Sequence, residues 1–293
     1  IASCLVGSEM CIRDRYLSTN LSNNDGLNTH LLPGLNPLGV PKALADTTIP
    51  FNYNDIDQLI EIVDNNPDLG TIKMEVSRNF GPSPGYLKHI RKICDENNII
   101  LIFDECTSGF RETFGGLHKK YGIDPDMAMF GKALGNGHAI TAVIGTSSIM
   151  EFAQETFISS TFWTERIGPT AALKTLDIME REESWNKITE TGLNITNGWK
   201  EISNSYGIDI KTTGIPALTS FSINSEYWYE LKTYITQEML KKNLLATNSV
   251  YVSLAHDEEV LEIYFEALEK VFKKISDFDN YKDVNKYLDG PIC

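Results

Sequence analysis

The chain of 293 residues has few cysteines, and their arrangement suggests no cross-link. The five cysteines are odd in number and show no CxxC or histidine-linked spacing: Cys4, Cys11, Cys94, Cys106 and Cys293. Such a pattern indicates neither a disulfide framework nor a zinc site. A reducing, cytoplasmic location is therefore the expectation.

Long apolar runs and an excess of positive charge are also missing. The longest apolar run, residues 99–103, has the length of a strand, whereas a membrane-spanning helix needs roughly 18 apolar residues. The formal net charge is −14. Because this charge repels phosphate groups on average, nucleic acid and anionic membranes are not expected as partners.

The first fifteen residues differ from the rest of the chain. Residues 1–15 show no clear periodicity and no apolar core of a secretory signal. They resemble translated read-through of a sequencing adapter. We therefore expect a non-native leader at residues 1–15 and a chain that is truncated at its N-terminal side.

From Asp55 onward, helical and strand patterns alternate. Asp55 is predicted to cap a helix, and short strands are predicted at residues 71–75, 99–103, 126–130 and 140–145. The run at 99–103 is continuously apolar, which is typical of a strand buried on both faces. The alternation indicates an α/β fold with βαβ units and a mostly parallel sheet.

The last third of the chain has a different character. After a predicted helix at about residues 169–183, two segments at 219–223 and 249–254 alternate like half-exposed strands, with helices between and after them. This pattern is typical of a smaller α+β unit. We predict a partial large domain over residues 16–180 and a small C-terminal domain over residues 181–293.

Two charged residues follow predicted strands of the sheet. Asp104 ends the apolar run 99–103, and Lys132 enters a glycine-rich turn after the strand at 126–130. Ligands of open α/β sheets bind at the carboxyl ends of strands. Asp104 could equally be a helix cap or part of a structural ion pair, and a single lysine in a loop is more often a surface residue.

Taken together, Asp104 and Lys132 suggest one ligand. They lie one strand–connection–strand unit apart, so both side chains could reach the same edge of the sheet. Pyridoxal phosphate requires such a pair, because a carboxylate keeps its ring nitrogen protonated and a lysine amine binds its aldehyde carbon. A pyridoxal-phosphate site is therefore expected there.

The motifs around these residues resemble those of one family. Residues 104–111 read Asp-Glu-Cys-Thr-Ser-Gly-Phe-Arg, and residues 130–137 read Phe-Gly-Lys-Ala-Leu-Gly-Asn-Gly. In residue type and spacing they are similar to the signature of class III aminotransferases, over roughly residues 16–293. Within that class the chain most resembles the branch of glutamate-1-semialdehyde aminomutase. The resemblance implies a pyridoxal-phosphate transferase fold of type I.

The resemblance also implies roles for individual residues. Lys132 would form the Schiff base with pyridoxal phosphate, and Asp104 would pair with the protonated ring nitrogen. Cys106 would lie against one face of the ring, and Thr107 would lie near the ring hydroxyl. Thr161 would reach the cofactor phosphate of a neighbouring subunit, which implies a homodimer.

The chain departs from the family pattern at three places. Val76 stands where the family commonly has proline, and residues 163–166, Trp-Thr-Glu-Arg, replace a stretch of small residues. The family's phosphate-binding loop and the aromatic residue that stacks on the ring are expected upstream of Tyr16, and neither is present in this sequence. The second departure leaves the substrate open, and the third leaves cofactor binding by this chain open.

Ping-pong transamination between a small-molecule amino donor and an oxo acceptor is the activity that the resemblance implies. Intramolecular aminomutase chemistry is the nearest alternative. A non-catalytic partner subunit or scaffold is the alternative from another class. Because a scaffold has no use for a buried lysine–aspartate pair, Asp104 and Lys132 favour the enzyme.

Overall fold

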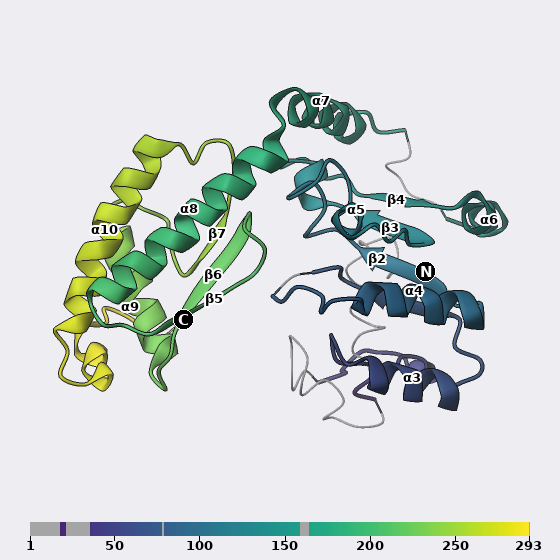
Figure 1. Cartoon of the computed structure of the whole chain (residues 1–293), viewed down its shortest axis with the longest axis horizontal. Helices are drawn as coiled ribbons and strands as arrows, with labels where there is room; N and C mark the ends of the chain where they lie inside the picture. The colour runs from purple at the N-terminus through teal and green to yellow at the C-terminus, as the bar shows by residue number, and fades with distance from the viewer. Residues whose placement is uncertain (1–17, 22–35, 78, 159–163, 293) are drawn as a thin grey trace.

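The computed structural model describes residues 18–21, 36–77, 79–158 and 164–292. These residues form two sheets with their own helices (Figure 1). The first group of elements comprises η1 (Lys42–Leu44), α3 (Ile56–Asn65), β1 (Thr71–Met74), α4 (Tyr86–Asn97), β2 (Ile100–Asp104), α5 (His118–Tyr121), β3 (Met127–Phe130), η2 (Lys132–Leu134), β4 (Ala142–Gly145), α6 (Ser147–Met150), η3 (Glu151–Glu155) and α7 (Ile167–Glu182). The second comprises α8 (Ser184–Ser205), β5 (Ile210–Thr213), β6 (Leu218–Ile223), α9 (Trp228–Leu240), β7 (Ser249–Tyr251), α10 (Glu258–Ser276) and η4 (Tyr281–Tyr287).

The first sheet has the strand order β1-β2-β3-β4. β1, β2 and β3 run parallel, and β4 pairs with β3 in the antiparallel direction. The expected mostly parallel sheet is therefore confirmed. The register places Asp104 opposite Met129, so the last residue of β2 lies close to the end of β3.

Helices α3 and α4 cover one face of this sheet (Figure 1). Asp55 caps α3 as predicted, since its Oδ1 accepts a hydrogen bond of 3.0 Å from the backbone N–H of Gln58. On the covered face, Leu101 and Phe103 of β2 are fully buried. The intervening residues Ile100 and Ile102 are only half-buried.

The expectation that the run at 99–103 is buried on both faces was therefore wrong for the described structure. Continuous apolar sequence shows that a strand tolerates burial on both sides, but not that both sides are covered.

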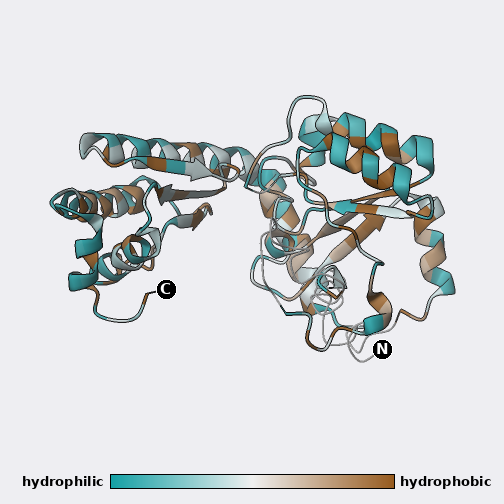
Figure 2. Cartoon of the chain, turned by 90° about the horizontal axis from the view of Figure 1, so that it is seen from below, coloured by the Kyte–Doolittle hydropathy of each residue, from teal (hydrophilic) through white to brown (hydrophobic). Residues whose placement is uncertain are grey.

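The strands at the centre of this group are brown in Figure 2, while its helices carry teal on their outer sides. Among the described residues, no helix is both long enough and apolar enough to cross a bilayer.

The second sheet is antiparallel, with the order β5-β6-β7. Strand β6 supplies the fully buried Phe221, against which Trp199 of α8 and Phe272 of α10 pack. The Trp199 indole N–H donates a hydrogen bond of 2.7 Å to the Tyr264 hydroxyl, so both polar groups are satisfied inside the core.

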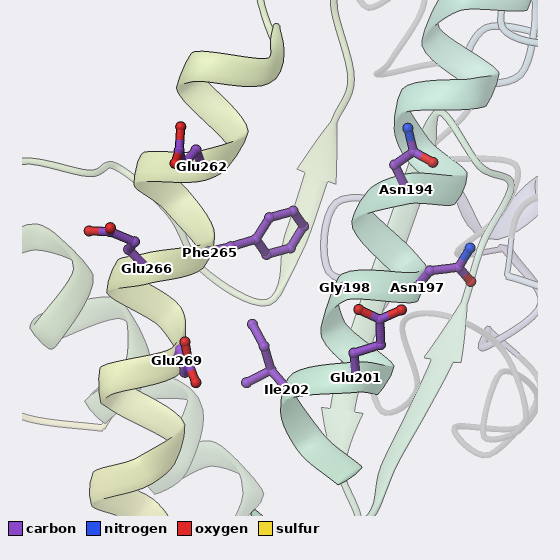
Figure 3. A pocket seen from close by; sticks show the side chains of 9 residues that line it. All are labelled: Asn194, Asn197, Gly198, Glu201, Ile202, Glu262, Phe265, Glu266 and Glu269. Atoms are coloured by element: carbon purple, nitrogen blue, oxygen red, sulfur yellow. The ribbon is translucent and has the colours of Figure 1, made fainter. Parts of the chain in front are cut away.

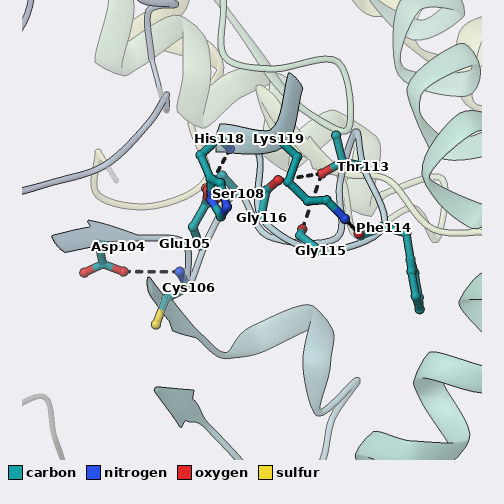
Figure 4. Close-up of polar contacts among 10 residues, drawn as sticks. All are labelled: Asp104, Glu105, Cys106, Ser108, Thr113, Phe114, Gly115, Gly116, His118 and Lys119. Carbon is teal, nitrogen blue, oxygen red and sulfur yellow. Dashed lines mark hydrogen bonds and ion pairs between the residues drawn. The ribbon is translucent and has the colours of Figure 1, made fainter. Parts of the chain in front are cut away.

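A buried carboxylate holds the loop that follows β2 (Figure 4). The Oε1 atom of Glu105 accepts hydrogen bonds from the backbone N–H of His118 at 3.0 Å and lies 2.9 Å from its Nδ1. The Ser108 hydroxyl donates to Oε2 of Glu105 at 2.5 Å. Burial alone opposes the charged carboxylate, but the hydrogen bonds from His118 and Ser108 outweigh it and hold the pKa of Glu105 below its ordinary value.

Replacing Gly192 by alanine should destabilise the chain. A Cβ atom on this residue of α8 would lie 1.9 Å from the Pro216 carbonyl oxygen, so backbone must move. We expect the free energy of unfolding of Gly192→Ala to fall by about 1–3 kcal/mol in urea titrations. Gly70→Ala is the control, because its Cβ would meet nothing within 4 Å. Equal stability of the Gly192 variant and the wild type would contradict the described packing.

Replacing Glu105 by glutamine should cost stability in a pH-dependent way. Because the folded-state pKa of Glu105 is lowered, its contribution is present above the unfolded-state pKa of about 4.3 and is lost as the pH falls through the folded-state value. We expect Glu105→Gln to lose about 1–3 kcal/mol at pH 7 and less at acidic pH. Urea unfolding at several pH values measures this, with the exposed Glu96→Gln as control. A loss that does not shrink in acid would show that the charge of Glu105 is unimportant.

Candidate functional site

Lys132 lies where the chain leaves the sheet. It is the first residue of the 3-10 turn η2, two positions after the end of β3. Its backbone has φ +43°, in the left-handed region that side chains other than glycine rarely adopt. Such strain costs roughly 1–3 kcal/mol and tends to persist at functional sites.

The Lys132 side chain contacts the loop after β2. Its Nζ donates a hydrogen bond of 2.5 Å to the Thr107 hydroxyl oxygen. Thr107 is only 5% exposed, so the hydroxyl that accepts from Lys132 belongs to a buried side chain. The contact joins two segments that are 25 residues apart in sequence and fixes the direction of the lysine amine.

Asp104 has a partner at each carboxylate oxygen. Oδ1 accepts a hydrogen bond from the Cys106 N–H at 3.2 Å (Figure 4), and Oδ2 accepts one from Lys73 Nζ at 2.7 Å. Burial alone would raise the pKa of Asp104. The hydrogen bond and the charge of Lys73, with the Cys106 N–H, outweigh burial and leave the pKa of Asp104 below its ordinary value. Asp104 is therefore ionised at neutral pH.

Cys106 lies between Asp104 and the lysine turn. A Cβ atom on Gly131 would be 3.4 Å from the Cys106 Sγ atom, so the turn passes close to the thiol. Burial and the nearby Asp104 carboxylate raise the pKa of Cys106 to about 11. The thiol is consequently neutral and behaves as a small apolar group with a weak donor.

The structure brings four of the five predicted site residues together in two contacting pairs. Lys132 contacts Thr107, and Asp104 contacts Cys106. The two pairs are adjacent because Cys106 and Thr107 are consecutive residues of the loop after β2. Thr161 lies outside the described residues. Lys132 is exposed, and its Nζ contacts Thr107 and not Asp104, so the buried lysine–aspartate pair that we expected is not seen among the described residues.

Two features of the site were not predicted from the sequence. Lys73 pairs with Asp104 although 31 residues separate them. The alternating pattern of β1 signals that Lys73 points away from the covered face, but not which residue it meets. The hydrogen-bond network of Glu105, Ser108 and His118 was also not predicted, since a single buried glutamate leaves no periodic signal in the sequence.

One departure from the family pattern has a structural explanation. The carboxylate of Glu165 accepts hydrogen bonds from the backbone N–H groups of Ile167 and Gly168, the latter at 3.0 Å. N–H groups in the first turn of a helix such as α7 have no acceptor within the helix itself. Glu165 therefore satisfies the first turn of a helix.

A cavity lies elsewhere in the structure, between α8 and α10 (Figure 3). It measures about 560 Å³. Four glutamates line it together with Phe265, Ile202 and Gly198: Glu201, Glu262, Glu266 and Glu269. No lysine lines this cavity, and Lys132 and Asp104 lie on other elements, so its size does not make it the site of the predicted chemistry.

Among the described residues, no group of histidine, cysteine and acidic side chains could hold a metal ion.

The donor set beside β2 and β3 fits the ring end of pyridoxal phosphate. It offers a primary amine on Lys132, an ionised carboxylate on Asp104 and a neutral thiol on Cys106. The amine suits the aldehyde carbon, the carboxylate suits a protonated ring nitrogen, and the thiol can pack against a ring. The residue expected to hold the phosphate, Thr161, is outside the described part of the chain.

The sequence is similar to curated aminotransferases and related enzymes. It is 30% identical over 250 residues to the 3-aminobutyryl-CoA aminotransferase of Cloacimonas acidaminovorans (strain Evry), covering 81% of this chain and 60% of that protein. It is 28% identical over 274 residues to the glutamate-1-semialdehyde 2,1-aminomutase of Syntrophobacter fumaroxidans (strain DSM 10017 / MPOB), covering 86% and 63%. The chain thus spans somewhat less than two thirds of the length of these relatives.

The fold is similar to those of solved transaminase structures. The FumI protein of Sphingopyxis sp. MTA144, in its PLP internal aldimine form, matches with a TM-score of 0.79 and 18% identity, covering 93% of this chain and 71% of that one. An omega-transaminase from Sphaerobacter thermophilus matches with a TM-score of 0.72 and 20% identity, covering 80% and 59%. These similarities confirm the predicted α/β fold of type I.

A family model described as aminotransferase class III matches residues 79–270, which is more than half of the chain. The matched segment contains Asp104, Cys106, Thr107 and Lys132, the residues whose contacts form the candidate site. The chain belongs to the class III aminotransferase family.

Proposed function

We propose that this chain is the cofactor-binding part of a pyridoxal-phosphate-dependent aminotransferase that moves an amino group from a small-molecule donor to an oxo acceptor by a ping-pong mechanism. The observation that carries the proposal is the contact of 2.5 Å between Lys132 Nζ and Thr107 Oγ1. Thr107 directly follows Cys106, whose backbone N–H donates a hydrogen bond to the ionised Asp104. Family membership supports the same reaction.

Bound pyridoxal phosphate would supply an aldehyde that condenses with amines and a ring that accepts an electron pair. Lys132 would hold the aldehyde end, and its amine, once displaced by a donor, could accept and return a proton at Nζ. Thr107 limits where this Nζ can lie. Asp104, as an ionised carboxylate, would keep a proton on the ring nitrogen.

Aminomutase chemistry of the glutamate-1-semialdehyde type is the second candidate. The 28% identity to the Syntrophobacter aminomutase favours it, while the 30% identity to the Cloacimonas aminotransferase favours transfer between two molecules. The two are separated by whether product forms from a single amino aldehyde or only after a separate oxo acceptor is added. A non-catalytic scaffold is disfavoured, because Lys132 and Asp104 are both retained.

The division into a partial large domain at residues 16–180 and a small domain at 181–293 is part of the proposal. The change from α7 to α8 at Glu183, whose backbone has φ +48°, supports a boundary there. A cytoplasmic location, expected from the cysteine pattern, remains a prediction.

We further propose a homodimer. Large apolar side chains are exposed around β4 and η3, including Ile144 at 56%, Phe152 at 65% and Phe157 at 93%. Apolar side chains that together form an exposed patch commonly mark a protein interface. Residues 159–163, with Thr161, directly follow this surface in sequence, so the proposed reach of Thr161 into a partner's site is compatible with it.

Lys132 should be the lysine that binds the cofactor. Borohydride reduction of the chain incubated with pyridoxal phosphate, followed by peptide mapping, is expected to label Lys132, because its amine is accessible and fixed beside Thr107. Lys120→Ala, which removes a lysine paired with Glu112, should leave the label unchanged, and Lys132→Ala should abolish it. A specific label on another lysine, or none, would contradict the proposed function.

Charged residues on the apolar surface should separate the subunits. We expect the Phe152→Glu, Phe157→Glu double variant to have the mass of one chain by light scattering, and the wild type that of two, since burying two unpaired carboxylates is unfavourable. Leu245→Glu is the matched control, because Leu245 is 94% exposed but lies in the second group of elements. A monomeric wild type, or a double variant that stays dimeric, would argue against this interface.

A further inference from the structure

Lys73 is the charged residue closest to the proposed ring-nitrogen partner. It lies on β1, and its Nζ is 2.7 Å from Asp104 Oδ2. The parallel register pairs Lys73 with Ile102, two residues before Asp104, so both charged side chains point to the same side of the sheet. The strands therefore place the two side chains next to each other.

The register neighbours of the pair on the adjacent strands are apolar. Ile102 and Met129, the register neighbours of Lys73 and Asp104, are both half-buried side chains. The Asp104 side chain is 16% exposed, whereas that of Lys73 is 39% exposed. The carboxylate is thus held in place, while the ammonium group can move toward water.

Both oxygens of Asp104 have partners in this arrangement. Cys106 N–H occupies Oδ1 and Lys73 occupies Oδ2. A carboxylate offers about four acceptor positions, so a ring N–H can still be accepted. The ring N–H would, however, have to share the negative charge of the carboxylate with the ammonium group of Lys73. Two cations near one carboxylate repel each other.

We infer that Lys73 is a positioning residue that competes with the cofactor's ring nitrogen for Asp104. The inference rests on the proposed function. In the absence of cofactor, Lys73 compensates the charge of the partly buried Asp104. When pyridoxal phosphate binds, Lys73 gives up part of this contact, so it weakens cofactor affinity and reduces protonation of the ring nitrogen.

This role differs from that of an ordinary structural ion pair in the sign of two effects. Loss of a structural pair should lower stability and leave cofactor affinity unchanged or lower. Loss of a competitor should lower the stability of the cofactor-free chain but raise its affinity for pyridoxal phosphate, because Asp104 becomes fully available. The two quantities can be measured separately on the same variant.

The test is Lys73→Met in the full chain, which keeps most of the length of the side chain and removes its charge. Absorbance titration with pyridoxal phosphate should show an affinity increase of roughly two- to fivefold, the range of an ion pair that remains partly in water. Urea unfolding without cofactor should show a lower midpoint. Lys73→Arg keeps the charge and should bind pyridoxal phosphate like the wild type.

Two further variants distinguish the mechanism. Lys92→Met removes the exposed pair of 3.6 Å between Lys92 and Glu96 and should leave the affinity unchanged. In an Asp104→Asn background the gain from Lys73→Met should disappear, because there is no carboxylate left to compete for. An unchanged or weaker affinity of Lys73→Met, or a gain that survives Asp104→Asn, would overturn the inference.

Failure of the proposed function gives a different result. If the wild-type chain itself binds no pyridoxal phosphate and borohydride labels no lysine, the aminotransferase proposal fails, and the inference fails with it. If the wild type binds and is labelled at Lys132 but Lys73→Met gains no affinity, only the role of Lys73 is wrong.

Discussion

Parallel pairing of β2 with β3 is the constraint on which the candidate site depends. The register places Asp104 opposite Met129, and the chain then needs only three more residues to reach Lys132. Both strands therefore deliver their last residues to the same edge of the sheet, where the loop after β2 and the turn after β3 meet. The contact between Thr107 and Lys132 is a direct consequence of this arrangement.

A buried polar network supports that loop from inside. Glu105 is fully buried between Asp104 and Cys106, and its carboxylate joins Ser108 to His118. Because an unsatisfied carboxylate inside a protein is strongly unfavourable, the three residues have to be placed together. The side chains on either side of Glu105 thus inherit a fixed position, although they are themselves partly exposed. This is how a loop can position groups with the accuracy that chemistry needs.

The charge balance at Asp104 depends on an adjacent strand. Lys73 lowers the pKa of the carboxylate and so keeps it ionised, as a partner of a protonated ring nitrogen must be. The same lysine occupies one of the oxygens that such a ring would use. In our proposal, a single contact would therefore assist the carboxylate when no cofactor is bound and oppose the cofactor when it binds.

The sequence by itself determined the order of the helices and strands, the mostly parallel sheet and the identity of the residues at its carboxyl edge. These follow from local patterns: alternation in the strands, the cap at Asp55 and the motifs around Asp104 and Lys132. Strand ends were predicted to within a few residues, as with β4, expected from residue 140 and observed from Ala142. Only the tertiary structure decided that one face of β2 is fully buried, that Lys132 is exposed and that Lys73 meets Asp104. Periodicity reports which side of an element a residue occupies, whereas a contact across 31 residues depends on the pairing and register of two strands, which no local pattern encodes.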